Sequence, residues 1–125
     1  MRTVYLNSNV FDRTYKLASR HSASMPEITS IASLESTPHA EVFETDAPRT
    51  IRLQIEADEH LPKHRHPESN VVLYVLEGIL ELTLGDDSYD LEQGDVVRFD
   101  GDQPISPHAL TESTALLVFA PKPDV

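Results

Sequence analysis

Short stretches of alternating apolar and polar residues, each ended by a turn signal, are the feature that most constrains the fold of this chain. An apolar side chain at every second position marks a strand with one buried face. The clearest example runs from Ile51 to Ala57, and residues 80–84 repeat the pattern. Such segments recur about every ten residues from residue 40 onward, with no convincing long helix between them. The pattern predicts an antiparallel all-β sandwich or barrel.

Glycine and aspartate residues separate the predicted strands and supply the tight turns of hairpins. A loop with two prolines is expected at residues 100–107, because proline interrupts the hydrogen bonding of a strand. The predicted strands are residues 41–45, 51–57, 71–76, 80–84, 88–91, 96–99 and 115–119, with a further short edge strand at residues 3–6.

The charge balance excludes several classes of partner. The chain has 21 Asp and Glu against 10 Lys and Arg, a formal net charge of −11. Binding to nucleic acids and anionic membranes depends on basic side chains, so neither partner is expected. The chain has no cysteine, which excludes disulfides and thiolate metal sites. It shows no secretory signal pattern and no apolar run near the ~18 residues of a membrane span, so a cytoplasmic protein is predicted.

A pair of histidines is the strongest candidate for chemistry. His64 and His66 stand one residue apart, between two prolines and just before the apolar run 71–76. On an extended chain their side chains point to the same side. Imidazole is the commonest metal ligand in proteins, so this pair predicts half of a metal site.

The sequence around these histidines resembles the two motifs of the cupin superfamily, which are small double-stranded β-helix barrels of the jelly-roll kind. Residues 58–78 match the first motif through the histidine pair and the closing Gly78. Residues 94–108 match the second motif through Gly94. The chain therefore looks like a small single-domain cupin.

The resemblance implies an all-β fold class, with a double-stranded β-helix (jelly-roll) barrel in residues 40–125. Residues 1–39 carry weak strand signals and are predicted to form an extended N-terminal arm that packs on the barrel or on a partner subunit. Because an arm and exposed strand edges favour pairing between subunits, we expect a homodimer.

The cupin motifs complete the histidine pair with a glutamate and a third histidine. The glutamate position falls on Val71 or on Asn70, depending on the end from which residues are counted, and Glu68 is a nearby alternative. The third histidine position falls on Ile105. A three-residue insertion in the preceding loop would bring His108 there instead, and loops absorb insertions at low cost. The metal ligands predicted from the resemblance are His64, His66, His108 and Asn70.

Three neutral imidazoles suit a divalent transition metal, namely Zn, Ni, Fe, Mn or Cu. A site without a carboxylate keeps the full charge of the ion and favours a small polar or anionic molecule. The resemblance thus implies a metal-dependent dioxygenase or an isomerase-like enzyme acting on a small-molecule substrate. The alternative is a non-catalytic barrel that senses a ligand or metal, with a degenerate metal site. Fold does not separate the two, and no catalytic residue is assigned.

Other polar and aromatic residues receive plainer predictions. We expect His21 and His39 to be surface histidines. His60 matches no family ligand, so we expect it on the surface or next to the metal ligands without binding the metal. Arg98 is expected on an exposed face, where arginine is most often found. Tyr74 lies in an apolar strand and is expected in the core, with its hydroxyl group hydrogen-bonded.

Overall fold

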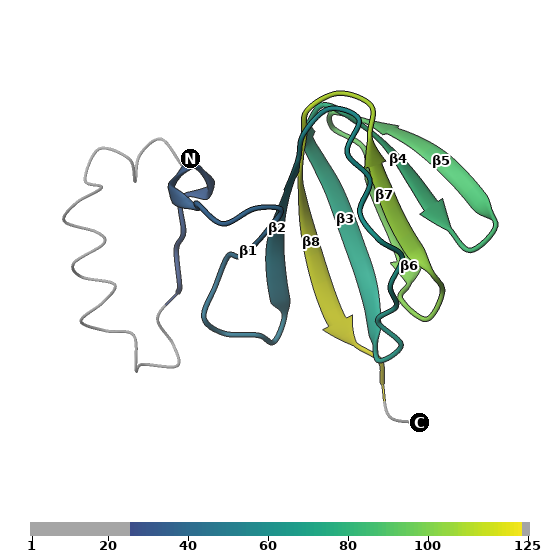
Figure 1. Cartoon of the computed structure of the whole chain (residues 1–125). Coiled ribbons are helices and arrows are strands. Elements are labelled where there is room, and N and C mark those ends of the chain that lie inside the picture. The colour runs from purple at the N-terminus through teal and green to yellow at the C-terminus, as the bar shows by residue number, and fades with distance from the viewer. Residues whose placement is uncertain (1–25, 124–125) are drawn as a thin grey trace. The chain divides into compact units, whose positions relative to one another are not determined.

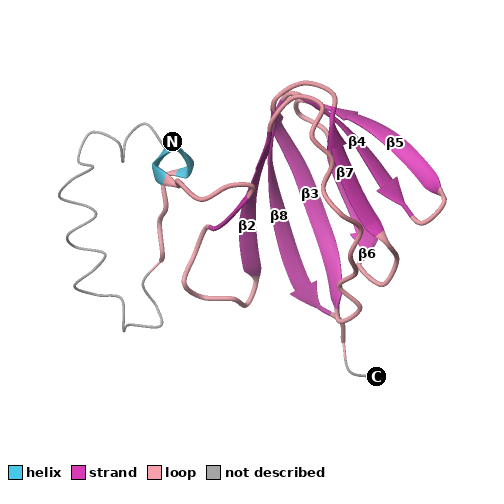
Figure 2. Ribbon diagram, viewed as in Figure 1, coloured by secondary structure: helices cyan, strands magenta, loops and turns pink. Residues whose placement is uncertain are grey.

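The computed structural model of this protein describes residues 26–123. The chain divides into two units, residues 1–30 and 31–125, and every regular element described lies in the second unit. No helix in the described part is long and apolar enough to cross a lipid bilayer. The elements are η1 (Ile31–Ser33), a single 3₁₀ turn, and the strands β1 (His39–Glu41), β2 (Arg49–Ile55), β3 (Ser69–Glu77), β4 (Ile79–Leu84), β5 (Asp87–Glu92), β6 (Val96–Asp100), β7 (Ile105–Ala109) and β8 (Ser113–Pro121) (Figures 1 and 2).

The strands form two antiparallel sheets. One sheet has five strands in the order β1-β2-β8-β3-β6, and the other has three in the order β5-β4-β7. The inner faces of both sheets contribute to one hydrophobic core. This arrangement confirms the predicted all-β fold, a double-stranded β-helix.

The core is formed by every second residue of the strands. Val71, Leu73 and Val75 of β3 are almost completely buried, whereas the residues between them lie on the outer face of the sheet. Leu80 and Leu82 of β4 are buried from the opposite sheet. Each such side chain stabilises the fold by about 1.5–3 kcal/mol relative to an exposed one.

Most predicted strands are confirmed, with small differences at their ends. Strands β2, β3, β4, β5, β6 and β8 each overlap the segment predicted for them. The first strand of the barrel, β1, begins earlier than predicted and ends at Glu41. The predicted strand at residues 3–6, His21 and most of the predicted arm lie outside the described residues, so the boundary at residue 39 stays a prediction.

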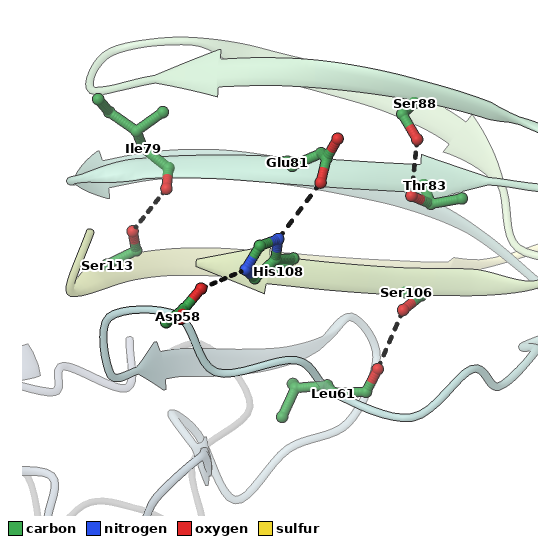
Figure 3. A network of polar contacts seen from close by, with 9 residues as sticks. All are labelled: Asp58, Leu61, Ile79, Glu81, Thr83, Ser88, Ser106, His108 and Ser113. Carbon is green, nitrogen blue, oxygen red and sulfur yellow. Dashed lines mark hydrogen bonds and ion pairs between the residues drawn. The ribbon is translucent and has the colours of Figure 1, made fainter. Parts of the chain in front are cut away.

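Strand β7 was not predicted, because its sequence contains Pro107. Proline lacks the N–H group that a strand needs, but it is tolerated where no partner requires that donor. The segment that carries His64 runs along the free side of β7, and the carbonyl of Leu61 would face the missing N–H group. The Ser106 hydroxyl donates a hydrogen bond to that carbonyl, at 3.0 Å (Figure 3). A side chain therefore replaces the donor that proline removes.

The structure corrects the prediction for Tyr74 and agrees with the prediction for Arg98. Tyr74 is 40% exposed on the outer face of β3, so its placement in the core was wrong. The alternation of β3 explains the error, since Val75 and Leu73 already occupy the inner positions on either side. Arg98 is exposed on β6, as expected.

Candidate functional site

His64 and His66 are held by backbone pairing with the second motif. The backbone of His64 exchanges two hydrogen bonds with Ile105, at 3.2 and 2.9 Å. The imidazole rings of the histidines then lie edge to face, with centroids 4.8 Å apart. Both rings line the same cavity, which agrees with the prediction that they share one side of the chain.

Gly101 holds the His66 turn through backbone contacts. The His66 N–H donates to the Gly101 carbonyl at 2.7 Å, and the Gly101 N–H donates to the Ser69 carbonyl at 2.9 Å. A Cβ atom at position 101 would lie 2.4 Å from the His66 carbonyl oxygen and 2.7 Å from that of Ser69. Only glycine therefore allows this close approach, and it fixes the backbone of His66.

A cavity of about 200 Å³ lies between the sheets beside these histidines. Its walls are mainly apolar and come from both sheets, including Leu53, Leu73, Leu82 and Phe99. Small-molecule sites in proteins are typically apolar hollows with a few convergent polar groups. The polar side chains of this cavity are His39, Arg49, His64 and His66.

Two of these four polar residues, His39 and Arg49, were not predicted as site residues. His39 is exposed, as expected for a surface histidine, and also lines the cavity. The signal for Arg49 was present, because extending the alternation of β2 back from Ile51 puts it on the inner face. His39 could not be found in this way. Its place depends on the register between β1 and β2, in which it lies opposite Leu53, and that pairing is long-range.

Arg49 is held in place by an acidic side chain and an aromatic ring. Its Nε and Nη2 atoms donate to Oε2 of Glu41, at 3.0 and 2.6 Å. Its guanidinium lies over the Phe119 ring, 5.6 Å from the centroid. The hydrogen bond to Glu41 raises the pKa of Arg49, so the side chain stays charged.

The pKa values of His39 and His66 are both lowered, which favours the neutral imidazole. Burial is the main cause that lowers the pKa of each, because it removes water from the charged form. The nearby His64 and the Arg49 guanidinium lower both pKa values further. Neutral imidazoles can donate one hydrogen bond and accept another.

His108 lies on the outer face of β7 and is not brought to the histidine pair. Its Nε2 atom is 3.1 Å from Asp58 and its Nδ1 atom 3.3 Å from Glu81 (Figure 3). These hydrogen bonds raise the pKa of His108. The His60 ring stacks on it, with centroids 3.7 Å apart. His108 thus belongs to a separate polar cluster.

Asn70 and Glu68 are also apart from the cavity. Asn70 precedes the inward-facing Val71 on β3, so it lies on the outer face of the sheet, opposite Asp100 in register. Glu68 is exposed in the preceding turn. Of the four ligands predicted from the resemblance, the structure brings together only His64 and His66.

The other two ligand positions of the motifs carry apolar side chains. Val71 and Ile105, on which the glutamate and the third histidine fall when residues are counted without an insertion, both line the cavity. Within residues 26–123, no three His, Asp or Glu side chains form a group that could hold a metal ion. The residues present therefore do not fit the metal centre that the motifs imply.

Comparison with known proteins agrees with the fold. The model of the cupin domain family matches residues 51–120, and no curated protein matches the chain. Similar solved structures include KdgF from Halomonas sp., with 17% identity and a TM-score of 0.68 over 80% of this chain and 97% of that one. Another is TT1209 from Thermus thermophilus, with 22% identity and a TM-score of 0.67 over 78% and 100% of the two chains. An RmlC-like cupin from Shewanella frigidimarina has 15% identity and a TM-score of 0.65 over 79% and 95%.

Proposed function

Since the chain belongs to the cupin domain family, we propose that its barrel binds a small organic molecule in the cavity beside His64 and His66. One observation carries the proposal: a cavity of about 200 Å³ has apolar walls and four polar side chains. The apolar walls bury the ligand, and the polar side chains orient it.

The apolar side chains at two positions of the motifs support the binding of an organic molecule and not a metal-centred reaction. Val71 and Ile105 add methyl groups to the cavity wall at the positions where the family motifs carry a glutamate and a histidine. Burying the apolar part of a ligand against such groups contributes about 25 cal/mol for each Å² removed from water.

A metal-dependent cupin enzyme, predicted from the sequence, is the second candidate. The observation in its favour is that the imidazole rings of His64 and His66 lie together in one cavity, with centroids 4.8 Å apart. The ions to be tested are Zn, Ni, Fe, Mn and Cu. Elemental analysis after loading with each ion, in wild type and in a His64→Ala/His66→Ala variant, measures this candidate directly. A stoichiometric metal that the double variant loses would favour it.

Ligand binding is tested by filling the cavity. Val71→Phe adds a ring on the inner face of β3, and Val72→Phe adds the same ring on the outer face, which makes it the matched control. A library of small organic molecules is screened by methyl NMR of the cavity residues Leu53, Leu73 and Ile105. We expect saturable shifts in wild type and Val72→Phe and none in Val71→Phe. If no library member shifts these methyl signals in wild type, the proposal is wrong.

A further inference from the structure

The position of Arg49 in the cavity wall places a fixed positive charge beside a mainly apolar space. It lies opposite Phe119 in the pairing of β2 with β8, on the same face as Ile51 and Leu53. Both of its hydrogen bonds go to one oxygen of Glu41 and use Nε and one Nη2 hydrogen. A guanidinium has five N–H donors, so the N–H groups of Nη1 and the second N–H of Nη2 remain for a ligand. This edge binds a carboxylate with two parallel hydrogen bonds.

Arg49 is the one Arg or Lys side chain among the described residues that line the cavity. Among the described residues that line the cavity, none carries a carboxylate. The protein as a whole has a net charge of −11, which opposes the approach of any anion. The Arg49 guanidinium is already paired with the Glu41 carboxylate, so a ligand with one negative charge is favoured over a ligand with two.

The apolar space sets the size of the rest of the ligand. An apolar cavity of about 150 Å³ holds benzene. A cavity of about 200 Å³ therefore accommodates a phenyl-sized group, with Leu73 and Leu82 on its walls. The Phe119 ring and the His66 ring, with centroids 4.7 Å apart and edge to face, offer aromatic surfaces near the charge.

We infer that the ligand of this cavity is a monocarboxylate with a compact apolar group of phenyl size, and that Arg49 binds its carboxylate. This inference rests on the proposed function, because it names the class of molecule that the same cavity binds. Glu41 is a positioning residue in this arrangement, since its carboxylate holds the guanidinium and does not line the cavity.

Phenylacetate and its amide, phenylacetamide, test the inference, because they have nearly the same shape and differ in charge. Calorimetry measures the affinity of each, and methyl NMR of Leu73 and Ile105 establishes that binding occurs in the cavity. We expect wild type to bind phenylacetate about tenfold or more tightly than phenylacetamide, the factor that a charged hydrogen bond supplies. Phenylmalonate, a dianion, is expected to bind more weakly than phenylacetate.

Variants assign the preference to one side chain. Arg49→Gln is expected to remove the preference for phenylacetate over phenylacetamide. Arg49→Lys keeps the charge without the planar edge and is expected to keep part of the preference. Arg98→Gln removes an arginine from the exposed outer face and is the matched control, with wild-type behaviour.

The outcomes separate this inference from the function on which it rests. Equal wild-type affinity for acid and amide, or an undiminished preference in a folded Arg49→Gln variant, overturns the inference and leaves a ligand-binding cavity. Absence of cavity shifts with either compound, alongside shifts with other library members, also overturns the inference alone. Absence of cavity shifts with every compound overturns both.

Discussion

The six histidines of this chain include side chains in two opposite environments. His39 and His66 line the cavity, and burial lowers their pKa values. His108 lies beside Asp58 and Glu81 on an outer face, and hydrogen bonds to them raise its pKa. For the same residue type, the neutral form is therefore favoured in one place and the charged form in the other. Surroundings, and not residue type, decide which role each has.

The raised pKa of His108 predicts a pH dependence of stability. In the unfolded chain this imidazole has a pKa near 6.5, and in the folded protein the pKa is higher. Its stabilising effect is therefore fully present below about pH 6.5 and is lost as the pH rises through the folded value. Between pH 6 and pH 8, we expect the free energy of unfolding in urea to fall less for His108→Gln than for wild type.

A second substitution checks the cause of this pH dependence. Glu81→Gln keeps the side chain's shape but removes one of the two charges that raise the pKa of His108. Its stability loss over the same pH range should fall between those of wild type and His108→Gln. Parallel pH profiles for all three proteins would contradict the assignment.

Among the elements, the segment that leads into β3 and the loop after β6 are joined by backbone hydrogen bonds. Gly101 is the contact point, because its backbone bonds both to His66 and to Ser69. The cavity histidines therefore depend on a loop that is distant in sequence. The sequence motif locates the histidines, but it does not reveal which residue supports them.

Gly101→Ala is expected to lower both stability and ligand affinity. The added Cβ would displace the backbone of His66, at a cost of about 1–3 kcal/mol in the free energy of unfolding. Gly94→Ala is the control, since position 94 has a φ of +94° but open space around its Cβ. That strain costs about 1–2 kcal/mol at a turn that does not line the cavity. Urea unfolding and calorimetry with phenylacetate measure the two effects, and a similar loss of affinity in both variants would contradict the prediction.

At the scale of the whole molecule, the barrel was predictable from sequence, and much of its cavity was not. Alternation along a strand is local, so it gave β2 and β4 their correct faces, whereas the continuous apolar run of β3 did not reveal that Tyr74 faces outward. The histidine pair was found for the same reason. His39 and the outward position of His108 depend on registers between strands far apart in sequence, which local patterns do not encode.

The predicted homodimer has a candidate face on the five-stranded sheet. Tyr74 and Val96 lie opposite each other on its outer side, and they are 40% and 63% exposed. Adjacent exposed apolar side chains favour association, because contact removes them from water. Sedimentation equilibrium is expected to give a dimer for wild type and a monomer for Tyr74→Asp. Tyr89→Asp, which changes a similarly exposed tyrosine of β5, should remain dimeric. A monomeric wild type would contradict the prediction.

The net charge of −11 belongs to the molecule as a whole, and it predicts that salt stabilises the fold. Like charges are closer together in the folded protein than in the unfolded chain, so their repulsion destabilises the compact state. Salt shortens the range of this repulsion, from about 30 Å at 0.01 M to about 10 Å at 0.1 M. The free energy of unfolding in urea should therefore rise with NaCl over this range.

The origin of the salt effect is tested by reducing the charge. Asp86 lies in the turn between β4 and β5, Asp87 is the first residue of β5, and both are exposed. Replacing both with lysine lowers the net negative charge without touching the core. If repulsion causes the effect, the double variant gains less stability from NaCl than wild type does. Choline chloride at equal ionic strength should act like NaCl, because screening does not depend on the identity of the cation. A gain specific to sodium, or an equal gain in the charge-reduced variant, would indicate ion binding and would contradict repulsion as the cause.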